Sequence, residues 1–326
     1  MAQITLVEAI NQALAYELKA DPQVLLLGED IGKNGGVFRA TQGLQAQFGE
    51  ERVRDTPLAE SMIAGLAIGM AMMGLKPVAE FQFMGFIYPA LDQIISHASR
   101  MRNRTRGRLH CPLVFRTPYG CGIHAPEHHS ESTEALFAHI PGLRVVIPSS
   151  PARAYGLLLA AIRDPDPVIF LEPARLYRYA KQEVPDNGQA LPLDLCFTLR
   201  EGRDLTLVTW GAMVKETLVA AETLAQDQIE VEVIDVATIK PLDMETILTS
   251  VEKTGRCLIV HEAARTGGVG AEIAAQLAEQ GLFFLKAPPK RLCGFDTIVP
   301  YAALEKYYAP DEKQIVQAAH ELMEFV

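Results

Sequence analysis

The stretch TLVEAINQALAYELKADPQVLLL, residues 5–27, decides the fold class of this chain. It begins with Thr5-Leu6-Val7-Glu8, a capping box in which the threonine and glutamate side chains bond the free backbone amides of a helix start. Apolar residues recur at helical spacing at Ile10, Leu14 and Leu18. The run at 24–27 is then entirely apolar, which is typical of a strand buried on both faces. The stretch therefore predicts a helix that leads into a buried strand.

The same alternation continues through the first half of the chain. Further strand-like runs lie at residues 77–81, 112–116, 144–147 and 167–171. Helical patterns separate them near residues 60–73, 86–102 and 151–162. Parallel strands need crossover helices between them, so this alternation predicts an α/β fold with a mostly parallel sheet.

A polar, turn-rich segment at residues 179–202 interrupts this pattern. A second series of strands is predicted at residues 205–210, 229–236, 257–261 and 282–285. Helical patterns accompany them near residues 213–226, 243–253, 268–280 and 311–324. We therefore expect a first domain at 1–180, a linker at 181–202 and a second domain at 203–326. The length of 326 residues also favours two domains, at roughly 150 residues each.

Composition and charge exclude several classes of protein. Hydrophobic residues make up 49% and charged residues 21% of the chain, as in a globular and not a disordered protein. The longest uncharged stretch, residues 61–75, is shorter than the roughly 20 residues of a membrane helix. A net charge of −10 argues against a nucleic-acid groove, and the one basic cluster, residues 100–108, is expected at a solvated or subunit-facing helix end. The first residues resemble no targeting segment, so we expect a cytoplasmic protein.

The five cysteines are widely separated along the sequence, at Cys111, Cys121, Cys196, Cys257 and Cys293. They form no CxxC pair and have no histidine partner at metal-ligand spacing. The spacing therefore argues against a zinc site and a disulfide framework, and it predicts reduced thiols.

The densest polar segment is YGCGIHAPEHHSES, residues 119–132, in a predicted loop after a strand. Its histidines can donate or accept protons near neutral pH, and loops at the carboxyl ends of strands carry function in open α/β sheets. The alternative is that they are exposed or helix-capping side chains. The segment alone does not separate these two interpretations.

A second candidate is DTPLAES, residues 55–61, where a turn starts a helix that is almost free of charge. Glu60 lies at this start, where burial would raise its pKa and let it share a proton with a ligand nitrogen. The alternative is a glutamate that is favourable in a first helical turn because of the helix dipole. Gly65, Gly69 and Gly74 in the helix that starts there predict that another element packs closely against it.

Two glycine-containing loops invite comparison with phosphate-binding loops. The segment at 28–32 carries Glu29 and Asp30, which would repel a phosphate. The segment HEAARTGGVG at 261–270 precedes a helix, but it lacks the spacing and the following acidic residue of a dinucleotide fingerprint. We expect ordinary turn glycines in the second segment.

Eight segments together carry a resemblance to one family. They are GEDIG (28–32), GGVFRAT (35–41), DTPLAE (55–60), PVAEFQFMGF (77–86), HHSES (128–132), PGLRVVIPSSP (141–151), RDPDPVIFLEP (163–173) and KTGR (253–256). In order and spacing they resemble the β subunit of the thiamine-diphosphate-dependent 2-oxo acid dehydrogenases, most similar to the bacterial pyruvate type. The resemblance covers essentially the whole chain. It implies two three-layer α/β domains, a transketolase-like pyrimidine-binding domain followed by a transketolase C-terminal domain.

The resemblance assigns roles to several residues. It implies that Glu60 hydrogen-bonds the aminopyrimidine ring of thiamine diphosphate and so promotes deprotonation of the thiazolium carbon. Leu58 and Phe86 match positions that pack against this ring, and Glu29 matches a position that orients Glu60. His129 matches the histidine that assists acyl transfer to a lipoyl group.

Two further assignments follow from the resemblance. His128 occupies a position that the family does not fix, so the roles of His128 and His129 stay open. A family potassium site would use backbone oxygens of Leu113 and Ala161 with the carboxylates of Asp164 and Asp166. Such oxygen-rich turns also arise for structural reasons.

The diphosphate and magnesium motif of thiamine enzymes, GDG followed by an asparagine, does not occur in this sequence. The resemblance therefore implies an α subunit that holds Mg²⁺ and the diphosphate half of the cofactor, in an α2β2 heterotetramer. It also implies a β–β contact through the C-terminal domain, and docking of the small basic binding domain of the acyltransferase component (E2). The implied activity is oxidative decarboxylation of pyruvate. Branched-chain or acetoin enzymes, a non-catalytic docking scaffold, and a nicotinamide-dependent dehydrogenase remain alternatives.

Overall fold

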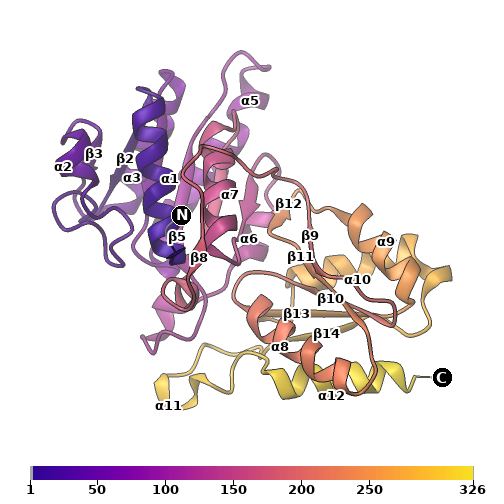
Figure 1. Cartoon of the computed structure of the whole chain (residues 1–326). Coiled ribbons are helices and arrows are strands. Elements are labelled where there is room, and N and C mark those ends of the chain that lie inside the picture. Colours follow the sequence, from indigo (N-terminus) through magenta and orange to yellow (C-terminus); the bar gives the residue numbers. More distant parts are fainter. Residues whose placement is uncertain (1–2, 326) are drawn as a thin grey trace. The chain divides into compact units, whose positions relative to one another are not determined.

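The computed structural model describes residues 3–325 and is drawn in Figure 1. Contacts divide the described chain into two compact units. The first contains the residues up to Tyr119 together with Leu136–Leu193, and the second contains Gly120–Ala135 together with the residues from Asp194 onward. The sequence-based division assigns the loop at 120–135 to the first domain, whereas its contacts assign it to the second unit.

The first unit is built on a parallel sheet with the strand order β6-β7-β5-β4-β2-β3. Its strands are β2 (Val24–Gly28), β3 (Val53–Asp55), β4 (Lys76–Glu80), β5 (Val114–Tyr119), β6 (Arg144–Val146) and β7 (Val168–Pro173). A separate antiparallel pair joins β1 (Gln3–Ile4) to β8 (Gln182–Glu183). Every residue of β2, β5 and β7 is buried, which explains why these runs are mostly apolar.

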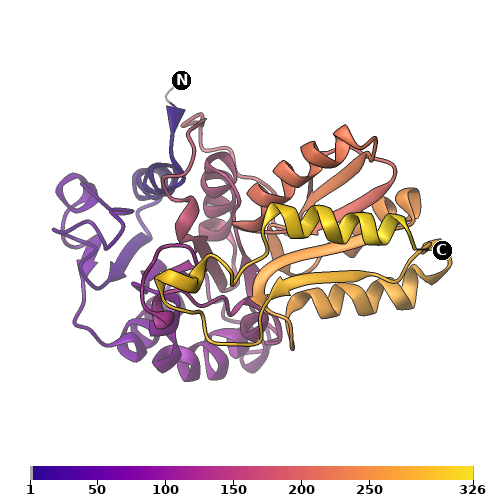
Figure 2. The same cartoon turned by 90° about the horizontal axis from the view of Figure 1, so that it is seen from below.

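Helices cover both faces of this sheet. They are α1 (Leu6–Ala20), α2 (Leu44–Phe48), α3 (Glu60–Met72), η1 (Met84–Ala90), α4 (Leu91–Ser96), η2 (Ala98–Arg100), α5 (Met101–Arg104), α7 (Pro151–Arg163) and η4 (Ala174–Leu176). Helix α6 (Glu134–Ala138) begins with residues assigned to the second unit and ends with residues assigned to the first. The predicted capping box of Thr5 and Glu8 is present at α1. Helix α1 packs against α7, and Figures 1 and 2 show this pair on one face of the sheet with α3 on the other.

The second unit contains another sheet, with the order β14-β13-β10-β11-β9. Its strands are β9 (Phe197–Arg200), β10 (Leu205–Thr209), β11 (Val231–Asp235), β13 (Cys257–Ala264) and β14 (Lys290–Gly294), and β12 (Thr238–Lys240) follows β11 in the chain. Only β9 runs antiparallel to its neighbour among the described strands of this sheet. The helices are η3 (Glu127–His129), α8 (Met213–Gln226), α9 (Met244–Thr254), α10 (Val269–Gln280), η5 (Leu282–Phe284), α11 (Ala302–Glu305) and α12 (Glu312–Met323). The predicted α/β class is confirmed.

Two local predictions were wrong, and strand β3 was not predicted. The apolar run at 282–285 is not a strand: it forms η5 on the surface, with Phe283 98% exposed, and the strand is β14. The helix expected at 86–102 is broken into short turns, with Pro89 inside the first of them. Strand β3 was missed because only its first residue, Val53, is apolar and buried.

Candidate functional site

The candidate site in the first unit lies at the carboxyl edge of its sheet. Gly28 at the end of β2 pairs with Asp55 at the end of β3 and with Glu80 at the end of β4. The backbone amide of Thr56 donates to Gly28 O at 3.0 Å, which ties the segment after β3 to the end of β2. The predicted residues Glu29, Leu58 and Glu60 all follow these strand ends. Ligands of open α/β sheets bind at such an edge.

Glu60 is the first residue of α3 and is half-buried. The hydroxyl of the next residue, Ser61, donates to the backbone carbonyl of Pro89 at 2.5 Å, so the start of α3 is tied to η1, which carries Phe86. Burial raises the pKa of Glu29, and the charges of Asp30 and Glu60 raise it further. Glu60 therefore lies close enough to Glu29 to raise its pKa, while the role of Glu29 in orienting Glu60 stays a prediction.

The apolar residues predicted beside the ring differ in burial. Phe86 is half-buried and makes an edge-to-face contact with Phe83, with ring centroids 5.5 Å apart. Leu58 is 72% exposed. The helix that follows, which is almost free of charge, is not buried on all sides. Only one side of α3 is buried, while Met62 and Leu66 are 41% and 42% exposed, because no element within residues 3–325 packs against that side.

A buried ion network lies at the same edge, and the sequence analysis missed it. Arg116 donates through Nε and Nη2 to the two carboxylate oxygens of Glu172, at 2.7 Å each, and also bonds Glu80. The Tyr177 hydroxyl donates to Glu172 Oε2 at 2.5 Å. Burial raises the pKa of Glu80 even though Arg116 opposes this shift. The available signal was one buried charged residue within each of three mostly apolar strands, β4, β5 and β7.

This network also positions the loop at 35–41. The Tyr177 ring packs on Phe38 with centroids 5.0 Å apart. Gly36 has a φ of +80°, and a Cβ there would lie 3.0 Å from Glu80 Oε1. A glycine is therefore required where the loop backbone approaches the buried carboxylate.

The histidine-bearing loop is held within the second unit by two buried glutamates. Glu262 accepts from the backbone amide and the thiol of Cys121, both at 3.2 Å. Glu305 accepts from the amides of Gly122 and His124 at 2.6 and 3.0 Å. These bonds anchor the first part of the loop, which continues into η3.

The two candidate histidines are neighbours in η3. His128 is exposed, and its Nδ1 lies 3.9 Å from Glu131 Oε1. His129 is half-buried. Because His129 is less exposed than His128, its side chain has the more defined environment, which favours His129 as the functional histidine of the two.

The four residues of the predicted potassium site lie in the first unit, around the segment between α7 and β7. The backbone oxygens of Leu113 and Ala161 accept from the amides of Val168 and Asp164, at 3.0 and 3.3 Å. The Asp164 carboxylate bonds Arg144 Nε at 3.0 Å, and Asp166 bonds Arg102 Nε at 2.8 Å. Each predicted ligand already has a protein partner, so the potassium site stays a prediction.

The glycines at 268 and 270 serve a structural purpose in the second unit. His261 is fully buried, stacks on Trp210 with centroids 5.0 Å apart, and places Nε2 at 3.1 Å from Cys293 Sγ. Burial lowers the pKa of His261 to about 4. A Cβ at Gly268 or Gly270 would come within 2.9 or 2.8 Å of the His261 ring. These glycines make room for a buried histidine, which argues against a dinucleotide loop.

Metal-binding clusters and membrane-spanning helices are both absent from residues 3–325. No group of three or more His, Cys, Asp or Glu side chains in this range is arranged to hold a metal ion. No helix in this part of the chain is long and apolar enough to cross a membrane.

Comparison with known proteins identifies the class of fold. The model of the transketolase pyrimidine binding domain matches residues 2–180, and that of the transketolase C-terminal domain matches residues 196–315. A solved structure titled "Split gene transketolase, inactive beta4 tetramer" resembles the chain with a TM-score of 0.81 over 99% of both chains. At 23% identity this similarity concerns the fold alone. The fold is that of the two-domain transketolase-like proteins.

Sequence relatives define the family more narrowly. The "Pyruvate dehydrogenase E1 component subunit beta" of Staphylococcus epidermidis is 49% identical over 325 residues and that of Bacillus subtilis 48%, each covering 100% of both chains. The protein of the same name from Acholeplasma laidlawii is 51% identical over 315 residues, 97% of this chain and 96% of that protein. The chain belongs to the family of pyruvate dehydrogenase E1 component β subunits. Membership implies dependence on thiamine diphosphate.

Proposed function

We propose that this chain is the β subunit of a heteromeric pyruvate dehydrogenase E1. With an α subunit it would decarboxylate pyruvate oxidatively and pass the acetyl group to the lipoyl group of E2. The observation that carries the proposal is the position of Glu60. It begins α3 at the carboxyl edge of the sheet, within electrostatic range of Glu29 and beside a helix face that the described part of the chain leaves uncovered.

The described residues fit one half of thiamine diphosphate. Glu60 supplies a carboxyl group for the aminopyrimidine, Phe86 supplies a flat apolar face, and the exposed Leu58 can pack on the ring. The other half lacks a counterpart, because the sequence has no GDG motif and the described residues hold no metal-binding group. The bound cofactor would supply the electron sink for decarboxylation, and Mg²⁺ with the diphosphate would be held by the α subunit.

This chain's own residues would manage position and protons. Glu60 would share a proton with a nitrogen of the pyrimidine ring. Glu29, whose pKa burial already raises, would retain a proton close to Glu60 more readily than an ordinary glutamate. His129 would donate and accept a proton during acetyl transfer, since an imidazole does both near neutral pH.

The uncovered side of α3 supports an obligate α partner. Leu58, Met62, Leu66, Met72 and Met73 are exposed on and next to this helix. Gly69 lies on it with nothing within 4 Å of the position that a Cβ would occupy, so a partner helix can approach its backbone. Obligate interfaces are large and apolar, so the exposed apolar side chains on this side of α3 are suited to such an interface. An α2β2 assembly follows if two such pairs join through the β subunits.

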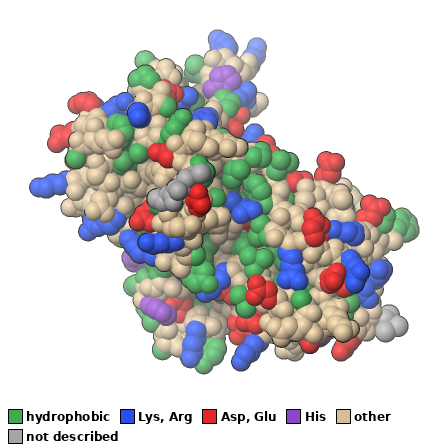
Figure 3. Space-filling view, in the orientation of Figure 1, with side chains coloured by type: hydrophobic (Ala, Val, Ile, Leu, Met, Phe, Trp, Pro, Cys, Tyr) green, Lys and Arg blue, Asp and Glu red, His purple; other side chains and the backbone are tan. Residues whose placement is uncertain are grey.

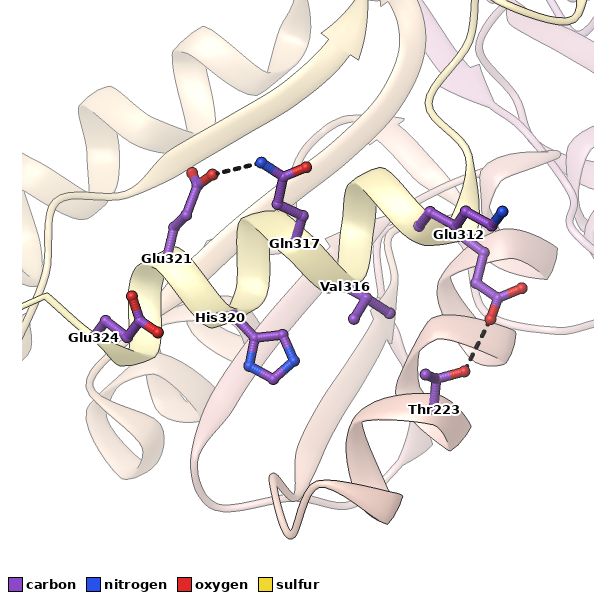
Figure 4. Close-up of a pocket in the computed structure, with 8 residues that line it drawn as sticks. Thr223, Glu312, Val316, Gln317, His320, Glu321 and Glu324 are labelled. Atoms are coloured by element: carbon purple, nitrogen blue, oxygen red, sulfur yellow. Dashed lines mark hydrogen bonds between the residues drawn. The ribbon is translucent and has the colours of Figure 1, made fainter.

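Surfaces of the second unit support two further contacts. Leu282, Phe283 and Phe284 form an exposed apolar group that suits a second β subunit. A groove of about 550 Å³ between α8 and α12 is lined by three glutamates, Glu312, Glu321 and Glu324, and by one lysine, Lys313, with Val316 and His320 between them (Figure 4). We assign this acidic groove to the basic binding domain of E2.

Reconstitution tests the proposal. The chain alone should not decarboxylate pyruvate, whereas the chain with its α subunit, thiamine diphosphate and Mg²⁺ should. Pyruvate should be used faster than 3-methyl-2-oxobutanoate or acetoin, and a reversed order would reassign the substrate. Full activity of the chain alone would reject the need for a partner. A melting temperature that rises more with KCl than with NaCl would support the potassium site.

The Glu60→Gln variant separates an enzyme from a docking scaffold. Loss of a positioned acid or base typically costs about 10²- to 10⁴-fold in rate, so overall activity should fall by at least about 100-fold. Assembly with the α subunit, measured by mass, should be unchanged. The Glu50→Gln variant, at an exposed turn, is the matched control and should keep full activity. Full activity of Glu60→Gln would favour the scaffold.

A further inference from the structure

A second cavity, of about 550 Å³, lies in the first unit where the start of α1, the loop at 39–42 and the segment after η4 meet. Three of its lining side chains are cationic, Arg39, Arg178 and Lys181, and one is anionic, Glu8. Figure 3 shows Lys and Arg side chains gathered on the face where α1 begins. Such a local excess of positive charge contrasts with a net charge of −10 for the chain.

The protein neutralises only part of the cationic charge in this cavity. Arg178 Nη2 donates to the backbone carbonyl of Phe38 at 2.8 Å, and Arg39 donates to the carbonyls of Asn34 and Gly36. Within residues 3–325, neither guanidinium nor the Lys181 ammonium has a carboxylate at ion-pair distance. Carbonyl partners orient the guanidinium groups but leave their charge available.

The one carboxylate in the cavity is already used elsewhere. Glu8 Oε2 accepts from both the backbone amide and the hydroxyl of Thr5, at 2.7 Å each. The Thr5 amide lowers the pKa of Glu8, and Lys181 and Arg178 add to this only as nearby charges. Glu8 thus caps α1 and leaves an excess of two positive charges in the lining.

Hydrogen bonds between the three segments that line the cavity fix its shape. Asn11 of α1 donates to the carbonyls of Ala40 and Gln42 at 2.9 and 3.1 Å. The bond from Arg178 to Phe38 joins the third segment to the same loop. Arg39 has a φ of +68°, a left-handed conformation that costs about 1–2 kcal/mol for a residue with a Cβ. The Arg39 guanidinium holds that turn through its bond to Asn34.

We propose that this cavity binds the phosphate groups of a small di- or triphosphate. Its volume lies within the roughly 300–1,000 Å³ of small-ligand sites. Two guanidinium groups can bind phosphate oxygens in pairs, and Lys181 adds a mobile point charge. Cations that come from separate segments suit a ligand with several linked phosphate groups better than a ligand with a single carboxylate. The site does not depend on the function proposed above.

Titration calorimetry with pyrophosphate and ATP tests this site, on the full-length chain alone and on its assembly with the α subunit saturated with thiamine diphosphate. Saturable binding is expected, weaker at 200 mM than at 50 mM salt. The Lys181→Gln variant should bind roughly three- to tenfold more weakly, and Lys181→Glu more weakly still. The control is Lys19→Gln, an exposed lysine at the far end of α1, which should bind as the parent does.

Each outcome is decisive for the site. ATP binding without pyrophosphate binding identifies a nucleotide, and equal binding of both identifies the phosphates alone as the ligand. Equal binding of citrate would overturn the phosphate assignment. No saturable binding in either preparation, or binding that Lys181→Glu leaves unchanged, would overturn the site itself.

Discussion

Replacing Arg116 by methionine tests whether the buried ion network stabilises the first unit. The Arg116 side chain is 2% exposed, and it is the cation shared by Glu80 and Glu172. Methionine has a similar length but would leave two buried carboxylates unpaired. Removing one partner of a buried ion pair costs about 3–5 kcal/mol. At about 2–4 °C per kcal/mol for domains of 150–250 residues, the melting temperature should fall by roughly 6–20 °C.

The Glu80→Gln variant separates the effect of charge from that of hydrogen bonding. Burial raises the pKa of Glu80 in the folded chain above its ordinary value. Between these two values the folded state holds more protons than the unfolded state, so stability falls as the pH rises through this window. Glutamine keeps an acceptor for Arg116 and does not titrate. The variant should therefore lose this part of the pH dependence, and at pH 8 it should be at least as stable as the parent.

Thermal unfolding of the full-length chain between pH 5 and pH 8, with hydrogen exchange of β5 and β7 to assign the transition, measures both effects. The Arg203→Met variant is the control, because its ion pair with Glu230 is largely exposed and should contribute less than about 1 kcal/mol. An Arg116→Met variant no less stable than this control would refute the reasoning. So would a Glu80→Gln variant as unstable at pH 8 as Arg116→Met.

Three further predictions concern other sites. The His129→Ala variant should slow acetyl transfer to lipoyl groups by about 10²-fold or more, while His128→Ala should have little effect; single-turnover transfer assays would show whether the order is reversed. Gly270→Ala should destabilise the chain by about 1–3 kcal/mol, because its Cβ would lie 2.8 Å from a buried histidine ring. Gly69→Ala has open space around it and should stabilise α3 by up to about 1 kcal/mol. Equal shifts in the melting temperature of the two variants would contradict the packing argument. Glu324→Lys should weaken E2 binding severalfold in titrations at low salt, and unchanged binding would move the E2 contact away from the α8–α12 groove.

Much of the fold could be predicted from local patterns in the sequence. The capping box at Thr5, the apolar run at 24–27 and the strand runs that became β10 and β13 act over a few residues, so the sequence alone reveals them. The predictions failed where the pattern was short or ambiguous. Strand β3 has one buried apolar residue, and the run at 282–285 has the composition of a strand but lies on the surface.

The candidate site was predicted in part. Glu60 was identified from its position at a helix start and Glu29 through the family resemblance, and the structure adds that the charge of Glu60 raises the pKa of Glu29. Arg116, Glu80 and Glu172 were missed because they are far apart in the sequence, and only strand pairing brings them together. The purpose of Gly268 and Gly270 was equally hidden, because it depends on the ring of His261 lying beside them.

The sequence by itself determined the class of fold, the missing diphosphate motif and the candidate carboxylates, since these depend on residue type and near neighbours. Only the tertiary structure decided which charges are buried together, which face of α3 stays uncovered, and that three cations surround one cavity. The physical reason is that burial and electrostatic interaction depend on distances in space. Parallel sheets bring distant residues together through long crossovers, so the sequence pattern cannot report those distances.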